Sequence, residues 1–272
     1  MLGATVIVFR EVLEAALVVT ILLAATRGLA GRNQWIGGGV ATGIVGALIV
    51  AYFAVNIADA FAGIGQEVFN AGVLFLAVLM LAWHNIWMSG HAREMVSNLK
   101  QVGNGVTAGN LPFYILAVAA GLAVLREGSE IVLFLYGLTV SGSEVAQMAL
   151  GGTLGLAGGL AIGTFLYFGL LGIPMSALFR VTGWLILLLA AGMAATAAGF
   201  LSQAGLLPSY QPLWNTSEFL SEHSLIGQLL HILVGYHASP TAIQLGFYLA
   251  TLVIIGSGMY FIGRQKSNPV TA

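Results

Sequence analysis

The sequence predicts an all-α membrane protein whose helices cross the bilayer seven times. Of its 272 residues, 58% are hydrophobic and only 7% are charged, whereas a soluble domain has about 25% charged residues. Apolar stretches long enough to span a bilayer, about 20 residues each, recur along the chain. The basic residues between them are distributed unevenly, which gives the helices an orientation. Together these observations predict a multi-pass protein of the cell membrane, in bacteria the inner membrane, with lipid around it.

The spans follow from the apolar stretches in order. The first must begin before its charged residues, because Val12 to Ala25 is too short to cross alone. The second and fifth contain Gly-x-x-x-Gly steps, which are typical of closely packed membrane helices. The fourth begins near Pro112, and the others follow from their apolar length. The predicted spans cover residues 4–26, 35–57, 67–88, 112–140, 145–171, 179–202 and 243–263.

The charges between the spans predict the topology. With the N-terminus outside and seven spans, every Lys and Arg outside two motifs described below falls on the cytoplasmic side, as the positive-inside rule requires. The outer side then has five acidic residues and no basic one. We therefore expect the N-terminus outside and the C-terminus inside. The inner residues are Arg27, Arg32, Arg93, Lys100, Arg180, Arg264 and Lys266, and the outer ones are Asp59, Glu67, Glu144, Glu218 and Glu222.

Two short motifs place charge where a membrane helix rarely has it. Residues 10–14 and 126–130 both read R-E-x-x-E and hold six of the 19 charged residues. The second motif begins about 21 Å into its helix, counted from Pro112 at 1.5 Å per residue. A charge at such depth costs roughly 2.5–3.5 kcal/mol and usually has a function. Residues three and four apart share a helix face, so each motif presents two carboxylates beside an arginine.

The motifs also mark an internal repeat. They are 116 residues apart, and the same offset relates Gly39 to Gly155 and Gly43 to Gly159. Because each repeat contains three spans, an odd number, the second copy must be inverted relative to the first, an arrangement common in transporters. We therefore expect two inverted three-helix repeats at 1–110 and 111–202, an extracytoplasmic loop at 203–242, and a seventh helix with a cytoplasmic tail at 243–272.

The chemistry of the paired motifs favours a cation site. Glu11, Glu14, Glu127 and Glu130 would bind a hard cation, with Arg10 and Arg126 as counter-ions in the empty site. Ferric iron fits by charge density, while Ca²⁺, Mg²⁺ and Mn²⁺ remain open. The chain has no cysteine, which excludes thiolate sites, and no basic tract that would bind nucleic acid.

Other interpretations of the motifs compete with this one. A buried Arg–Glu pair can simply stabilise helix packing, and buried acids also serve as proton relays. The main alternative is a proton-coupled transporter of another divalent metal or of an organic solute. In that case Arg10 and Arg126 would bind an anionic substrate.

The sequence resembles the oxidase-dependent iron transporter family, the iron permeases of bacteria and fungi. The resemblance rests on seven spans and on REVLE at 10–14 and REGSE at 126–130, in the first and fourth spans. It implies an iron permease rather than an enzyme, with the four motif glutamates binding iron in transit and Arg10 and Arg126 supporting them. Iron is then the transported substrate, with Fe³⁺ favoured and Fe²⁺ possible, and no organic cofactor is expected. The family also implies extracytoplasmic partners that oxidise or bind iron, and oligomeric state stays open.

Several residues outside the motifs have weaker claims. Glu218, Glu222, Asp59 and Glu67 fall on the predicted outer side, where they would receive iron at the mouth of the pathway or simply form a solvated acidic surface. His84 lies near the predicted inner end of the third span. We expect it to be a hydrogen-bonded residue of the membrane interface, with a role in iron release as the alternative.

Overall fold

The computed structural model is all-helical in the part of the chain that it describes, which is residues 1–60, 65–168, 175–217 and 235–265 with a few positions between 219 and 230. Its long helices follow the predicted spans closely, apart from the third. They are α1 (Leu2–Ala25), α2 (Arg32–Ala60), α3 (Gln66–Thr107), α4 (Tyr114–Val140), α5 (Val145–Tyr167), α6 (Met175–Gln203) and α8 (Ala242–Gln265).

Five of these helices are long and apolar enough to cross a bilayer. They contain the stretches Arg32–Ala54, Gln66–His91, Val145–Tyr167, Phe179–Gln203 and Ala242–Ile262. The helices α1 and α4, with 24 and 27 residues, are also long enough, but each carries the three charged residues of one motif. The protein is therefore a multi-pass membrane protein, and its two motif helices are those whose charge most needs protection from lipid.

The helix α3 is much longer than the predicted third span. It has 42 residues, about 63 Å at 1.5 Å per residue, so it extends well past a bilayer core of about 30 Å. Its polar last part contacts the end of α1, where the Thr107 hydroxyl donates a hydrogen bond to the carbonyl of Ala25 (3.1 Å). Hydropathy detects only the apolar part of such a helix, which is why the sequence prediction ended at residue 88.

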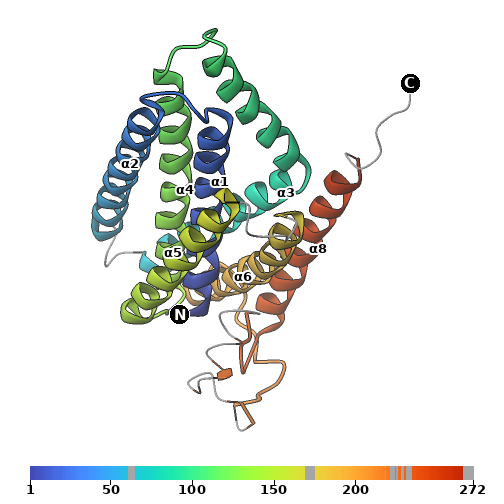
Figure 1. The fold of residues 1–272 in the computed structure, drawn as a ribbon. Helices are drawn as coiled ribbons and strands as arrows, with labels where there is room; N and C mark the ends of the chain where they lie inside the picture. The colour runs from blue at the N-terminus through green and yellow to red at the C-terminus, as the bar shows by residue number, and fades with distance from the viewer. Residues whose placement is uncertain are drawn as a thin grey trace.

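The two motif helices lie at the centre of the molecule. α1 and α4 contact each other and run in opposite directions (Figure 1). Each also packs closely against the second helix of the opposite half, α1 against α5 and α4 against α2, while α3 packs against α6. The part of the chain between α6 and α8 that the structure describes lies at the same end of the molecule as the N-terminus (Figure 1).

Glycines allow the closest of these helix contacts. A Cβ atom on Gly43 of α2 would lie 2.6 Å from the carbonyl oxygen of Gly121 on α4. A Cβ atom on Gly155 of α5 would lie 2.6 Å from the carbonyl oxygen of Thr5 on α1. Neither approach leaves room for a side chain, as expected for small residues at membrane helix contacts.

These contacts correct the glycine alignment inferred from the sequence. The motif offset of 116 relates Thr5 on α1 to Gly121 on α4. Gly155 contacts Thr5 and Gly43 contacts Gly121, so the two glycines make equivalent contacts. The contacts of Gly43 with α4 therefore match those of Gly155 with α1, whereas the constant offset paired Gly43 with Gly159. The contacts differ from the constant offset by four residues, about one helical turn. The segment joining α1 to α2 (26–31) is two residues longer than the one joining α4 to α5 (141–144), which accounts for part of this difference.

Candidate metal centre

The two R-E-x-x-E motifs meet where α1 and α4 cross. Glu11 of α1, Glu127 and Glu130 of α4, and His84 of α3 each place one ligand atom within 4.8 Å of all the others. All four residues are buried. Glu14 is buried beside them and contacts His84. The geometry therefore brings together the predicted glutamates and adds a histidine to them.

Within each motif the arginine pairs with the glutamate four residues later. Arg10 Nε lies 2.9 Å from Glu14 Oε1, and Arg126 Nε donates a hydrogen bond to Glu130 Oε1 at 3.0 Å. Arg126 Nε also lies 3.8 Å from Glu127 Oε1. The i, i+4 spacing predicted these pairs. They give Glu14 and Glu130 a close counter-ion and leave Glu11 without one in its own motif.

Several carboxylate oxygens in the cluster are buried without a hydrogen bond. Both oxygens of Glu11 and Oε2 of Glu127 have no hydrogen-bond partner among the described residues. Buried polar atoms are almost always satisfied in folded proteins, so each exception needs a reason. Oxygens that face a shared space inside a protein are suited to coordinate a cation there.

His84 connects the two motifs. Its Nε2 lies 3.1 Å from Glu14 Oε2 in hydrogen-bond geometry, and its Nδ1 lies 2.6 Å from Glu130 Oε2. The second contact is close, and Nδ1 also lies 3.4 Å from Arg126 Nη2. One ring therefore touches a carboxylate from each motif.

The expectation that His84 is hydrogen-bonded is confirmed, but its partners are glutamates of the two motifs in the interior of the protein rather than groups at the membrane interface. The side chain is 2% exposed and belongs to the cluster. Two adjacent polar residues, His84 and Asn85, in an otherwise apolar stretch were the available signal, since burial of such residues demands partners.

The two motif arginines differ in their surroundings. The Arg10 side chain is 2% exposed and that of Arg126 is 44% exposed. The guanidinium of Arg126 lies 5.5 Å from the centre of the Trp87 ring, which in turn stacks on His91. The Arg10 side of the cluster is thus covered by protein, whereas Arg126 reaches the protein surface.

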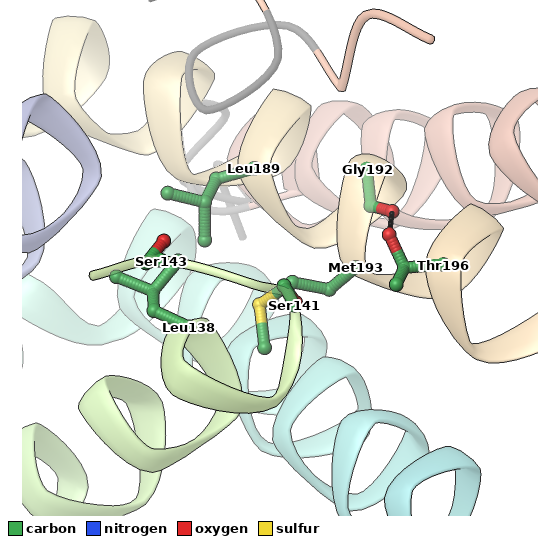
Figure 2. A pocket seen from close by; sticks show the side chains of 7 residues that line it. All are labelled: Leu138, Ser141, Ser143, Leu189, Gly192, Met193 and Thr196. Atoms are coloured by element: carbon green, nitrogen blue, oxygen red, sulfur yellow. Dashed lines mark hydrogen bonds between the residues drawn. The ribbon is translucent and has the colours of Figure 1, made fainter. Parts of the chain in front are cut away.

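A small cavity lies at the C-terminal end of α4. Figure 2 shows this cavity between α6 and the end of α4. It is lined by Leu138 of α4, by Ser141 and Ser143 just after that helix, and by four residues of α6. Its volume is about 20 Å³, enough for about one water molecule. Thr196 uses its hydroxyl in a hydrogen bond to the carbonyl of Gly192. The cavity is too small to admit a hydrated ion.

A larger groove borders the cluster on another side. It has a volume of about 970 Å³ and is lined by residues of α1, α2, α4 and α5, most of them aliphatic. Glu11 and Glu127 are its only acidic lining residues. Aliphatic walls offer an ion nothing in place of its hydration shell, so Glu11 and Glu127 are the candidate ion ligands of this groove.

The predicted outer-mouth residues do not join this cluster within the described part of the chain. Glu67 is exposed in the first turn of α3, about 26 Å along the helix from His84 at 1.5 Å per residue. Asp59 lies in the last turn of α2, and its side chain is outside the described residues. Glu218 and Glu222 also lie outside them.

Comparisons with known proteins agree with the motif resemblance. The model of the iron permease FTR1 family matches residues 1–263. The ferrous iron permease EfeU of Escherichia coli O6:H1 (strain CFT073) is 34% identical over 253 residues, which cover 91% of each chain. EfeU of Yersinia pestis is 32% identical over 91% of this chain and 89% of its own. No solved structure matches significantly. The chain belongs to the iron permease FTR1 family, whose members are transporters rather than enzymes.

Proposed function

We propose that this protein moves iron inward across the cell membrane through a site made by the glutamates of its two R-E-x-x-E motifs. The observation that carries this proposal is the convergence of Glu11, Glu127 and Glu130 in the interior of a membrane protein, with carboxylate oxygens that lack hydrogen bonds. A cation at this point would compensate the buried negative charge. Glu14, the fourth glutamate, lies next to the cluster and is held by Arg10.

An inverted repeat explains how two distant motifs form one site. Residues 1–110 and 111–202 form the two halves in this proposal, with the seven spans and outer N-terminus predicted from the charges. The antiparallel course of α1 and α4 supports it. So do the matching contacts of Gly43 with Gly121 and of Gly155 with Thr5. The segment 203–242 is the outer loop and 243–272 the last helix and inner tail.

The direction of transport rests on the difference between the two ends of the site. With the N-terminus outside, Arg10 lies on the outer side and the half-exposed Arg126 on the inner side. Leu122, one turn inward from Arg126, is 61% exposed. Its equivalent Val6 packs against the hydrophobic core. We therefore interpret the structure as open to the cytoplasm and closed to the outside, the state from which an imported ion would leave.

The oxidation state of the iron is part of the proposal. Carboxylate ligands suit ferric iron as a hard cation, whereas the similar proteins named above are called ferrous iron permeases. An extracytoplasmic partner that binds or oxidises iron would deliver the ion. An organic anion is less well supported as substrate, because Arg10 and Arg126 each pair with a glutamate of their own motif.

Uptake into proteoliposomes tests the proposal. Vesicles with the wild-type protein, supplied with either ferrous or ferric iron, should accumulate iron, measured as total iron inside the vesicles. Uptake should fall at least about tenfold in each of Glu11→Gln, Glu127→Gln and Glu130→Gln. Each substitution removes the negative charge of one ligand and keeps nearly the same side-chain shape. Glu67→Gln, which changes an exposed acid on α3, is the matched control. Near-normal uptake in two of the three site variants would refute the site.

A further inference from the structure

We infer that His84 binds the ion in transit through Nδ1, so that the site consists of three carboxylates and one imidazole, with Glu14 excluded from the coordination sphere. This inference rests on the proposed function, because it names the ligand set of the same site. It differs from the sequence prediction, which made the four motif glutamates equivalent ligands and gave no such role to His84.

The distances suit such a set. One atom from each of Glu11, His84, Glu127 and Glu130 lies within 4.8 Å of the others. Ligand atoms around a divalent transition metal with bonds of about 2.1 Å are at most about 4.2 Å apart. Small side-chain rotations are therefore enough to close the four atoms around an ion, and no helix has to move.

Glu14 is a poor candidate for a direct ligand because its carboxylate is already committed. It contacts the guanidinium of Arg10 at 2.9 Å and His84 Nε2 at 3.1 Å. Arg10 is 2% exposed, and its Nη1 has no hydrogen-bond partner among the described residues. Taking Glu14 away would leave a buried guanidinium unpaired, which is strongly unfavourable.

The contacts of the ring assign its two nitrogens different roles. Nε2 lies 3.1 Å from Glu14 Oε2, whereas Nδ1 lies 2.6 Å from Glu130 Oε2 and 3.4 Å from Arg126 Nη2. An ion that contacts both Nδ1 and Glu130 Oε2 would leave the Nε2–H bond to Glu14 in place. Histidine ligands of metals commonly donate their other N–H to a carboxylate in this way, which fixes the orientation of the ring. Arg10, Glu14 and His84 would thus form a chain that ends at the ion.

The histidine also makes the two halves of the site unequal. α6, which occupies the place of α3 in the second half of the proposed repeat, contains no His, Asp or Glu between Met175 and Gln203. Only one side of the site therefore supplies a nitrogen ligand. Imidazole suits iron and other transition metals, whereas Mg²⁺ and Ca²⁺ prefer oxygen ligands alone. His84 would accordingly select ferrous iron against the more abundant alkaline-earth ions.

X-ray absorption at the iron edge of the purified, iron-loaded protein tests this inference. The wild-type spectrum should contain the multiple-scattering signature of one imidazole, and His84→Gln should remove it and weaken ferrous iron binding at least about tenfold. His84→Asp should raise binding of Mn²⁺ or Ca²⁺ relative to Fe²⁺. His91→Gln is the matched control, because His91 lies on the same helix and stacks on Trp87. Circular dichroism and gel filtration confirm that each variant is folded.

The outcomes separate this inference from the proposed function. If Glu127→Gln binds iron normally, the glutamate site itself is wrong. If Glu127→Gln loses iron but His84→Gln keeps both the affinity and the imidazole signature, only the role of His84 is refuted. A wild-type spectrum without any imidazole signature, with iron bound, would overturn the inference directly.

Discussion

Substitution of Gly155 tests whether α1 and α5 are packed as closely as the structure indicates. A Cβ atom at this position would lie 2.6 Å from the carbonyl oxygen of Thr5 and 2.8 Å from the amide nitrogen of Phe9. Both atoms belong to the backbone, so no side-chain rotation relieves the overlap. Ordinary contact begins at 3.4 Å, so the two helices would have to separate by roughly 0.8 Å at this point, a strain of the kind that overpacking produces.

The expected cost follows from two opposing effects. Overpacking a close contact costs about 1–3 kcal/mol, and replacing Gly by Ala in a helix returns up to about 1 kcal/mol. Gly155→Ala should therefore lower the free energy of unfolding by about 1–2 kcal/mol. Gly152→Ala is the matched control on the same helix, because the nearest atom to its Cβ would be Val8 Cγ2 at 4.0 Å. That variant should be unchanged or slightly stabilised.

Thermal unfolding in detergent, followed by tryptophan fluorescence and by gel filtration after heating, measures the difference. Gly155→Ala should unfold at a lower temperature than both the wild type and Gly152→Ala. The same variant should also reduce iron uptake, because Thr5 and Phe9 belong to the helix that carries Glu11. Equal stability of the two alanine variants would refute the close approach of α1 and α5 and, with it, the register that relates Gly43 to Gly155.

Two further predictions concern the unequal ends of the site. Arg10→Gln should destabilise the protein by about 3 kcal/mol, because it leaves Glu14 as an uncompensated buried charge. Arg126→Gln should cost about 1 kcal/mol or less, because the Arg126 side chain is half-exposed. Chemical denaturation in detergent compares the two variants, and equal losses of stability would contradict the difference between the two arginines. The chain has no cysteine, so single cysteines report accessibility without background. In iron-free membrane vesicles, Leu122→Cys should react with an impermeant thiol reagent supplied from the cytoplasmic side. Val6→Cys should not react with the same reagent supplied from the outside. Rapid labelling of Val6→Cys would rule out a site closed to the outside.

The long helices were predictable from the sequence because lipid imposes a minimum apolar length and the motifs fixed where charge had to be buried. The first span was expected at 4–26 and the helix covers Leu2–Ala25, and the last was expected at 243–263 and covers Ala242–Gln265. The pairing of each arginine with the glutamate four residues later also followed from helix geometry.

Three features could not be derived in this way, each for a physical reason. The polar end of α3 is helical without being apolar, so hydropathy does not detect it. The glycine register depends on the length of the connecting loops, which a constant offset ignores. The role of His84 depends on how α3 is rotated against α1 and α4, and that rotation is set by packing between distant segments. A lone histidine has no periodic pattern from which its partners can be inferred.

The position of bound iron tests the central claim most directly. A structure of the iron-loaded protein, with anomalous scattering measured at the iron edge, should show one iron peak between α1 and α4, in contact with Glu11, His84, Glu127 and Glu130. Glu127→Gln protein treated in the same way should show no peak there. An iron peak elsewhere in the molecule, with the space between the two motifs empty, would contradict the account.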